Sequence, residues 1–307
     1  MRYNIGLEYI NIENYSPFCH INEMSLEYRY SPFQMPFILH QNIEVPVHPD
    51  TFEDLKLSKK DIIYTKEVHP TSSFRTVFLE DENIFLKVPL LRNITRWLRD
   101  LPAKQVLRAH YAAGLLEDNK CVGFDFLREE WKLFEDERYN FIKRTIPDTR
   151  LYPLFYIIKS QDFEIEFILR VMKNIISTWA YYASQDIYLE YHTQNILIDD
   201  NANIHYRDLS DIKSYSDSMI KASFIKYLPE KKDFNSLIFD RAICNQNFDF
   251  ILKYHPEIRE YIPEIKSYIR SSIEKYGLNF PSDYSYDFDY ANPERIPERT
   301  TLVSWRK

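Results

Sequence analysis

The chain has 307 residues, of which 45% are hydrophobic and 16% aromatic, so it can bury a core for one large or two modest domains. Its formal net charge of -7 and pI near 5.7 exclude the general basic face that nucleic-acid binding requires. Three widely spaced cysteines suggest neither a zinc site nor a disulfide framework, and no apolar run reaches membrane-spanning length, so we expect a cytoplasmic protein.

Glycine is scarce, with 4 in the whole chain. Neither the GxxxxGK[ST] loop nor the GxGxxG turn occurs, and both depend on glycine to bring the backbone close to phosphate groups. Any nucleotide must therefore be held by side chains and by other backbone geometries.

The N-terminal part of the chain is predicted to be rich in strands. The first 60 residues contain short apolar runs at 37–39 and 43–49 that indicate strands and turns, without a helix. Residues 76–79 and 84–88 are β-branched and aromatic and flank a polar turn, a pattern typical of an antiparallel hairpin.

Helical spacing predominates further along the chain. Apolar residues predict a helix over 93–116 with a break at Pro102, and a single apolar stripe predicts a long helix over 163–182. A polar loop then leads to a second hairpin, with strands at 196–198 and 204–206. After residue 214 the pattern is again helical, notably over 261–276, and the tail from Phe280 has little periodicity.

These elements predict an α+β fold: an antiparallel sheet that carries a nucleotide-binding hairpin, followed by a helical, palm-like or kinase-like part. The expected division is a β-rich nucleotide-binding part at residues 1–92 and a mainly helical part at residues 93–307. The second part carries a metal-binding and substrate-binding hairpin at residues 190–208.

Three hard oxygen donors, Glu190, Asn195 and Asp208, lie on the polar loop and just after the second hairpin. Carboxylate and amide oxygens suit Mg²⁺, which also keeps room for phosphate groups. Protein kinases place an Asp, an Asn and an Asp in the same order after a long helix, although here Glu190 stands first. The alternative interpretation is that these are turn and capping residues on a solvated loop.

Lys87 lies on a predicted strand from which its ammonium could reach nucleotide phosphates. The segment just before the first hairpin, Ser73 to Thr76, adds hydroxyl groups and the Arg75 guanidinium, which suit phosphate binding where no glycine loop exists. Lys87 could also be the solvent-facing residue of a half-buried strand, and Arg75 and Arg99 could form surface ion pairs.

Five segments in this order resemble conserved segments of the NRPS-independent siderophore synthetases of the IucA/IucC, or aerobactin-synthetase, type. They are Val45-Pro46-Val47-His48-Pro49, Ser73-Phe74-Arg75-Thr76, Lys87-Val88-Pro89-Leu90, Ile94-Thr95 with Arg99, and Glu190-Tyr191-His192-Thr193-Gln194-Asn195 with Arg207-Asp208. The resemblance is to a short form that lacks the family's N-terminal part.

The resemblance implies a Mg²⁺-dependent and ATP-dependent carboxylate-amine ligase. Such an enzyme adenylates a citrate-like carboxylate and condenses it with an amine, hydroxylamine or alcohol. The implied roles are ATP binding by Ser73, Arg75, Thr76 and Lys87; metal binding by Glu190, Asn195 and Asp208; substrate binding by Thr95, Arg99, His192 and Gln194; and catalysis by Arg99 and His192. The implied partners are these small molecules and a second copy of the chain or another subunit.

Two alternative functions remain open. A kinase-like phosphotransferase could use the same metal site, with Glu190 as the base and Lys87 on the phosphates, and it would release ADP. A non-catalytic partner, or one half of a split synthetase, would turn over no nucleotide by itself.

Overall fold

The computed structural model describes residues 32–70, 75–91, 93–94, 97–98, 100–147, 149–160, 162–191, 193, 195–223, 225 and 230–281. The chain divides into two compact units. The first unit comprises residues 1–110 and 127–153, and the second comprises residues 111–126 and 154–307. The functional division predicted from the sequence, 1–92 and 93–307, stays a prediction.

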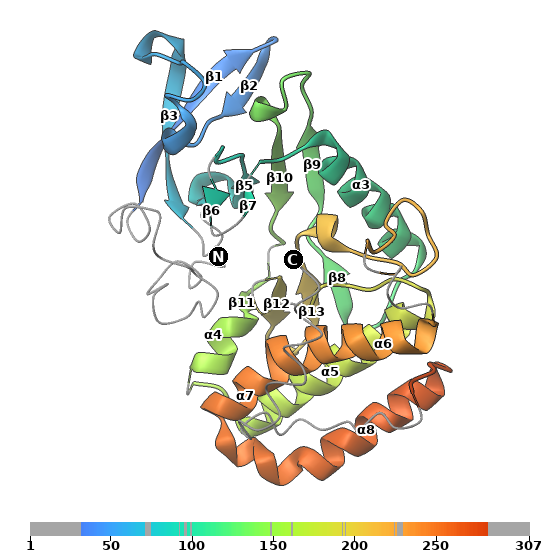
Figure 1. Cartoon of the computed structure of the whole chain (residues 1–307). Coiled ribbons are helices and arrows are strands. Elements are labelled where there is room, and N and C mark those ends of the chain that lie inside the picture. Colours follow the sequence, from blue (N-terminus) through green and yellow to red (C-terminus); the bar gives the residue numbers. More distant parts are fainter. Residues whose placement is uncertain are drawn as a thin grey trace. The chain divides into compact units, whose positions relative to one another are not determined.

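The first unit is built on a 7-stranded antiparallel sheet in the order β2-β1-β3-β4-β5-β10-β9 (Figure 1). Its strands are β1 (Phe33–His40), β2 (Ile43–Pro46), β3 (Ile62–Pro70), β4 (Thr76–Leu79), β5 (Ile84–Lys87), β9 (Glu129–Lys132) and β10 (Phe141–Thr145). The predicted first hairpin is therefore confirmed as β4 and β5, with Leu79 opposite Ile84 at the turn.

Strands β4 and β5 are buried on both faces. One face carries Val77 and Leu86, which belong to the main apolar core of the first unit. The opposite face carries Phe78 and Phe85, whose ring centroids lie 5.7 Å apart. Because side chains alternate along a strand, Lys87 shares this second face with the two aromatic rings.

A buried ion pair lies on the same face, between the neighbouring strands β9 and β10. Arg144 lies opposite Phe85 and donates from Nε to Glu129 Oε1 at 2.7 Å, with the two side chains 2% and 1% exposed. The indole Nε1 of Trp131 donates to the other oxygen of Glu129 at 3.1 Å. Removing one member of such a pair would leave a buried charge without its counter-ion. The intact pair favours the register in which β9 and β10 bring the two side chains together.

The second unit contains the predicted second hairpin, formed by β12 (Ile196–Asp199) and β13 (Ile204–Tyr206). Strand β8 (Phe124–Phe126) pairs with β13 in parallel. The long helix α5 (Ile165–Ser184) packs against β8 through Tyr182, whose ring meets that of Phe124 edge-on at 4.8 Å. The predicted helix over 163–182 is thus confirmed as α5.

Shorter helices complete this unit, and α8 lies beside α5 (Figure 1). They are α4 (Leu154–Lys159), α6 (Lys231–Phe239), α7 (Asp249–Tyr254) and α8 (Ile262–Lys275). A π-helical segment, Asp240–Phe248, connects α6 to α7. In the described part of the chain, helix α8 matches the helix predicted over 261–276, whereas most of the tail after Phe280 lies outside the described residues.

The helix predicted to begin at residue 93 is wrong at its start. Two short strands, β6 (Asn93–Ile94) and β7 (Trp97–Leu98), pair there, and helix α3 runs only over Ala103–Asp118. The carbonyl of Pro102 accepts the first helical hydrogen bonds, from Gln105 and Val106. Proline therefore begins this helix rather than interrupting it, as its fixed φ favours at a helix start. A further short strand, β11 (Leu151–Pro153), was not predicted.

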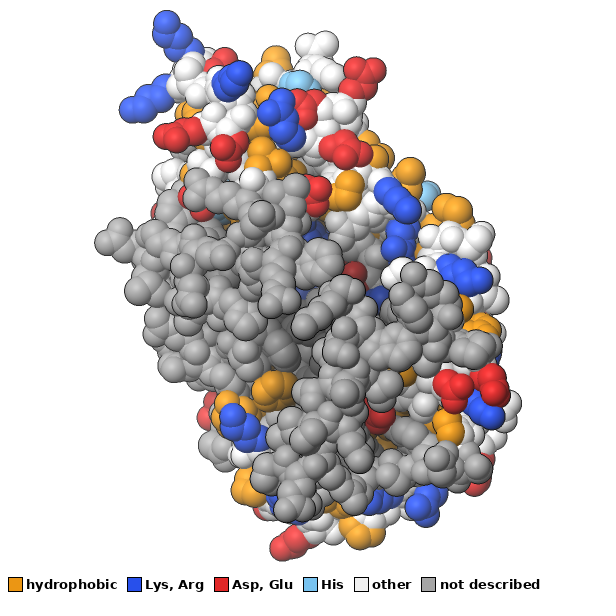
Figure 2. All heavy atoms as spheres, viewed as in Figure 1, with side chains coloured by type: hydrophobic (Ala, Val, Ile, Leu, Met, Phe, Trp, Pro, Cys, Tyr) orange, Lys and Arg blue, Asp and Glu red, His pale blue; other side chains and the backbone are white. Residues whose placement is uncertain are grey.

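The visible surface of the described residues carries charged side chains of both signs, interspersed with each other (Figure 2). Among the described residues, none of the helices combines the length and the apolar character needed to cross a bilayer. Both observations concern the described residues alone.

Two glycines of the second unit should respond oppositely to substitution by alanine. Gly123 has a φ of +77°, so Gly123→Ala should lower the free energy of unfolding by about 1–2 kcal/mol through backbone strain. A Cβ on Gly114, in α3, meets nothing within 4 Å, so Gly114→Ala should raise stability by about 0.5–1 kcal/mol. Urea unfolding of both variants measures the difference, and equal stabilities would contradict these assignments.

Candidate active site

Three of the four predicted ATP-binding residues are described, and they lie together at the open end of the β4–β5 hairpin. Thr76 and Lys87 are direct cross-strand partners and are 3% and 2% exposed. The carbonyl of Arg75 accepts a hydrogen bond from the Val88 amide at 2.9 Å, and the Arg75 guanidinium donates to the carbonyl of Asp100. The interpretation of Lys87 as a solvent-facing strand residue is therefore wrong.

Burial of Lys87 has a physical consequence. An ammonium group is rarely removed from water unless an anion or several oxygen acceptors compensate for the lost hydration. The neighbouring Thr76 hydroxyl and the apolar rings of Phe78 and Phe85 make this face of the sheet a low-dielectric environment, where a positive charge acts strongly on a bound anion.

The predicted metal-binding residues also lie together, at the open end of the β12–β13 hairpin. The side-chain amide of Asn195 donates to the carbonyl of Glu190 at 3.4 Å, and the carbonyl of Asn195 accepts from the Arg207 amide at 2.9 Å. Tyr206, at the end of β13, meets the backbone of Glu190: its hydroxyl accepts from the Glu190 amide at 3.2 Å. Asp208 follows two residues later.

The negative charge of this cluster contributes to a raised pKa of Tyr206. Complete burial raises that pKa well above its ordinary value, and the carboxylates of Glu190, Asp211 and Asp208 raise it further. Three carboxylates therefore act on one buried phenol. A site with this concentration of negative charge and of oxygen donors fits a hard divalent cation, which the residue types alone also indicated.

Asp208 adopts an unusual backbone conformation. Its φ of 71° and ψ of 61° lie in the left-handed region, which a residue other than glycine occupies at some cost in free energy. The carboxylate accepts a hydrogen bond from the Ser210 hydroxyl at 2.9 Å, at the start of the 3-10 helix Leu209–Asp211. Such local strain is frequent at functional sites, and here it sets the direction in which the Asp208 side chain leaves the hairpin.

The remaining predicted site residues lie outside the described residues: Ser73, Thr95, Arg99, His192 and Gln194. Within the described ranges there is no group of three or more His, Cys, Asp or Glu side chains arranged to hold a metal ion. The predicted set differs from such a group because it combines two carboxylates with the amide of Asn195.

Sequence reasoning missed Asp186, which follows the end of α5. Its carboxylate accepts hydrogen bonds from the hydroxyls of Ser214 and Ser216 and from the Ser216 amide, and it lies 3.1 Å from the Lys231 ammonium. It thereby ties the start of the Glu190 loop to the segment that follows Asp208. No motif marks this residue, because its partners are distant in the sequence.

Asp186→Asn should destabilise the protein in a pH-dependent way. Burial raises the pKa of Asp186, but the hydroxyls of Ser214 and Ser216, the Ser216 amide and Lys231 outweigh burial and hold that pKa below 3.8. A lowered pKa stabilises the folded state above the unfolded pKa, and this stabilisation is lost as the pH falls through the folded value. We expect a loss of about 1–3 kcal/mol near pH 7 that shrinks below about pH 3.8. Urea unfolding across this pH range measures it, and a loss independent of pH would contradict it.

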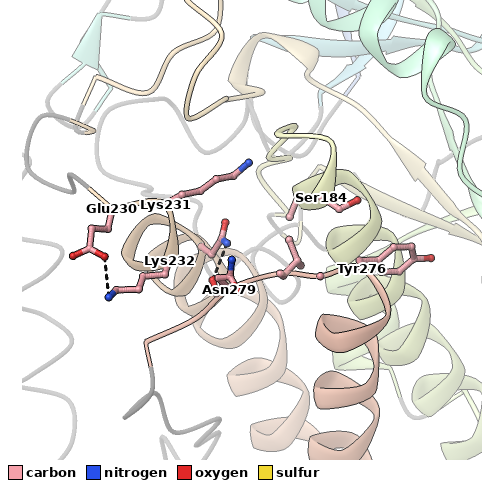
Figure 3. A pocket seen from close by; sticks show the side chains of 10 residues that line it. Ser184, Glu230, Lys231, Lys232, Tyr276 and Asn279 are labelled. Atoms are coloured by element: carbon pink, nitrogen blue, oxygen red, sulfur yellow. Dashed lines mark hydrogen bonds and ion pairs between the residues drawn. The ribbon is translucent and has the colours of Figure 1, made fainter.

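A cavity of about 430 Å³ lies elsewhere in the second unit, where the start of α6 meets the end of α8 (Figure 3). Lys231 and Lys232 line it, but Lys231 pairs with Asp186 and Lys232 pairs with Glu230 at 2.8 Å. The two ammonium charges are thus compensated, and none of the predicted site residues lines this cavity.

Comparisons with known proteins identify similar sequences and folds. The model of the IucA / IucC family matches residues 31–141, which contain the Arg75-Thr76 and Lys87 segments. No curated protein matches the chain. The resemblance to siderophore synthetases of the IucA/IucC type is thereby confirmed.

Solved structures extend the likeness of fold to both units. Aerobactin synthetase IucC from a hypervirulent pathotype of Klebsiella pneumoniae has a TM-score of 0.54 and 12% identity, over 85% of this chain and 55% of that chain. The ATP-bound aerobactin synthetase IucA of the same pathotype has a TM-score of 0.51 and 14% identity, over 77% of this chain and 55% of that chain. The chain therefore spans about half the length of these synthetases, and its mixed α+β fold is similar to theirs.

Proposed function

We propose that the chain is a siderophore-type synthetase that uses ATP and Mg²⁺ to activate a carboxylate and to join it to an amine, hydroxylamine or alcohol. The observation that carries the proposal is the burial of Lys87 beside Thr76, within the segment that matches the IucA / IucC family. The ATP-bound form of the similar synthetase IucA supports the choice of nucleotide.

Each unit contributes one part of the proposed chemistry. In the first, the Lys87 ammonium and the Arg75 guanidinium, with the hydroxyls of Ser73 and Thr76, bind the triphosphate and offset its charge. The β4–β5 hairpin is thus proposed as the nucleotide-binding hairpin expected from the sequence. The second unit is proposed to contain the kinase-like part.

In the second unit, the oxygens of Glu190, Asn195 and Asp208 hold Mg²⁺, which when bound neutralises phosphate charge. The carboxylate substrate is held by Thr95, Arg99, His192 and Gln194, of which the first two belong to the first unit. Among these, Arg99 and His192 act at the reacting carboxylate.

The reaction then has two balanced steps. An oxygen of the substrate carboxylate attacks the α-phosphorus of ATP, and the bond to the β-phosphate oxygen breaks, releasing pyrophosphate. The amine or alcohol next attacks the acyl carbon, AMP leaves, and the nucleophile loses one proton. In the first step two anions approach each other, so Arg99 and Lys87 stabilise the charge that accumulates between them.

The test is analysis of the nucleotide products. Purified protein is incubated with ATP, Mg²⁺ and citrate or another polycarboxylate, with and without hydroxylamine as a generic acceptor. We expect AMP and pyrophosphate only when the carboxylate is present, and a hydroxamate when hydroxylamine is added. ADP would instead identify a kinase-like phosphotransferase. No turnover under any of these conditions would contradict the proposal and support a non-catalytic partner or half of a split enzyme.

A further inference from the structure

Tyr191 is the most tightly held residue described in the loop that begins at Glu190. Its side chain is fully buried, and its hydroxyl donates to Thr178 Oγ1 at 2.8 Å. The Thr178 hydroxyl donates in turn to the carbonyl of Asn174 on α5, at 2.6 Å. The phenol end of Tyr191 is thus fixed to the long helix of the second unit.

The backbone of Tyr191 is held from a different element. Its carbonyl accepts a hydrogen bond from Asn247 Nδ2 at 2.7 Å, across 56 residues of sequence. Asn247 is completely buried. Because a buried amide is costly unless its polar atoms are hydrogen-bonded, and an apolar side chain would fill the same space at lower cost, packing alone does not explain an asparagine here.

Asn247 lies on the π-helical segment Asp240–Phe248, in which the Asp249 amide bonds to the carbonyl of Cys244, five residues earlier. The side chains of Ile243, Cys244 and Phe248 are also buried. A π-helix is rare because its wider turn packs less well, and it frequently occurs at functional sites. Asn247 thus places a polar side chain against the loop backbone beside the buried Ile243, Cys244 and Phe248.

The hydrogen bond from Asn247 to the Tyr191 carbonyl lies next to the proposed metal site in the sequence. The residue before Tyr191 is Glu190, whose amide and carbonyl are bonded to Tyr206 and Asn195. The loop backbone is therefore held at consecutive residues, by β13 at Glu190 and by the π-helical segment at Tyr191. A shift at Tyr191 would therefore also displace the adjacent Glu190, one of the residues proposed to hold Mg²⁺.

We propose that Asn247 is a positioning residue, which holds the Tyr191 carbonyl and thereby sets the course of the loop that carries Glu190 and Asn195. It does not touch the substrates. The consequence for catalysis rests on the proposed function, whereas the ordering of the loop does not.

The experiment compares Asn247→Asp with a matched control, Asn235→Asp. Both wild-type amides are buried and donate to a backbone carbonyl, but Asn235 donates to Asn279, at 2.9 Å. The Asn235 oxygen accepts from the Tyr188 hydroxyl at 2.6 Å, and an aspartate oxygen can still accept this bond, so Asn235→Asp removes only the bond to Asn279. A second variant, Asn247→Ala, removes the same bond without introducing a carboxylate. Hydrogen exchange of the backbone amides in residues 189–195 is measured for each protein, together with the Mg²⁺ concentration that gives half-maximal AMP formation.

We expect both Asn247 variants to accelerate exchange in this loop at least about tenfold, and to raise the half-maximal Mg²⁺ concentration by about tenfold at similar maximal rates. Asn235→Asp should leave both at the wild-type values. Loop exchange that stays at the wild-type rate, or that rises equally in Asn235→Asp, overturns the positioning role, as does an unchanged Mg²⁺ dependence. If the wild-type protein forms no AMP, the proposed function fails, and the exchange measurement alone still decides whether Asn247 orders the loop.

Discussion

Asp208→Asn should lower carboxylate-dependent AMP formation about 10²- to 10³-fold, because it removes one negative charge from the cluster proposed to hold Mg²⁺. The folded state should keep its stability to within about 0.5 kcal/mol, since asparagine tolerates the left-handed backbone conformation at this position and can still accept from Ser210. Initial rates of pyrophosphate release at saturating ATP measure the effect.

The matched control is Asp200→Asn, which removes the same charge from an exposed position in the turn of the same hairpin. It should leave the rate unchanged. A folded and fully active Asp208→Asn protein would show that Asp208 is not part of the site. Equal losses of rate in the two variants would show that the net charge of the protein, and not the carboxylate cluster, determines the rate.

Lys87→Met should separate activity from stability. The kcat/KM for ATP is expected to fall about 10²- to 10³-fold, because the buried ammonium no longer offsets phosphate charge. The protein should remain folded, since methionine fills a similar space and is common in buried positions. ATP-dependence of the initial rate and thermal unfolding are the two measurements.

Lys66→Met provides the comparison, because Lys66 lies in the same sheet, on β3, but its side chain is 34% exposed. Its kinetics for ATP should match those of the wild type. If Lys87→Met kept its affinity for ATP while losing stability, Lys87 would have a purely structural role.

Elements with a strong local pattern could be predicted from the sequence. Helix α5 has a continuous apolar stripe, and both hairpins consist of β-branched runs around polar turns, so their spacing alone identified them. The start of α3 was misplaced because Trp97 and Leu98 fit helical spacing although they form strand β7. For so short an apolar segment, only the tertiary context decides between helix and strand. Strands β9 and β10 were missed because they contain charged residues, and only the folded chain shows that Glu129 and Arg144 pair in its interior.

The candidate site was predictable to the extent that it lies in short motifs. Lys87, Glu190, Asn195 and Asp208 fall in segments whose order and spacing carry the resemblance. Asp186 and Asn247 could not be found in this way, because each acts through hydrogen bonds to residues distant in the sequence, and a lone Asp or Asn carries no pattern. Only the folded chain shows which backbone groups they hold.

The interrupted course of the first unit bears on how the chain folds as it leaves the ribosome. Strand β5 is complete at Lys87, but its neighbour β10 follows only after the chain has passed through residues 111–126 of the second unit. During that interval β5 is an exposed sheet edge, the kind of edge that recruits other chains into aggregates. Lysine is one of the residues that disfavour such pairing, and Lys87 is the last residue of this edge.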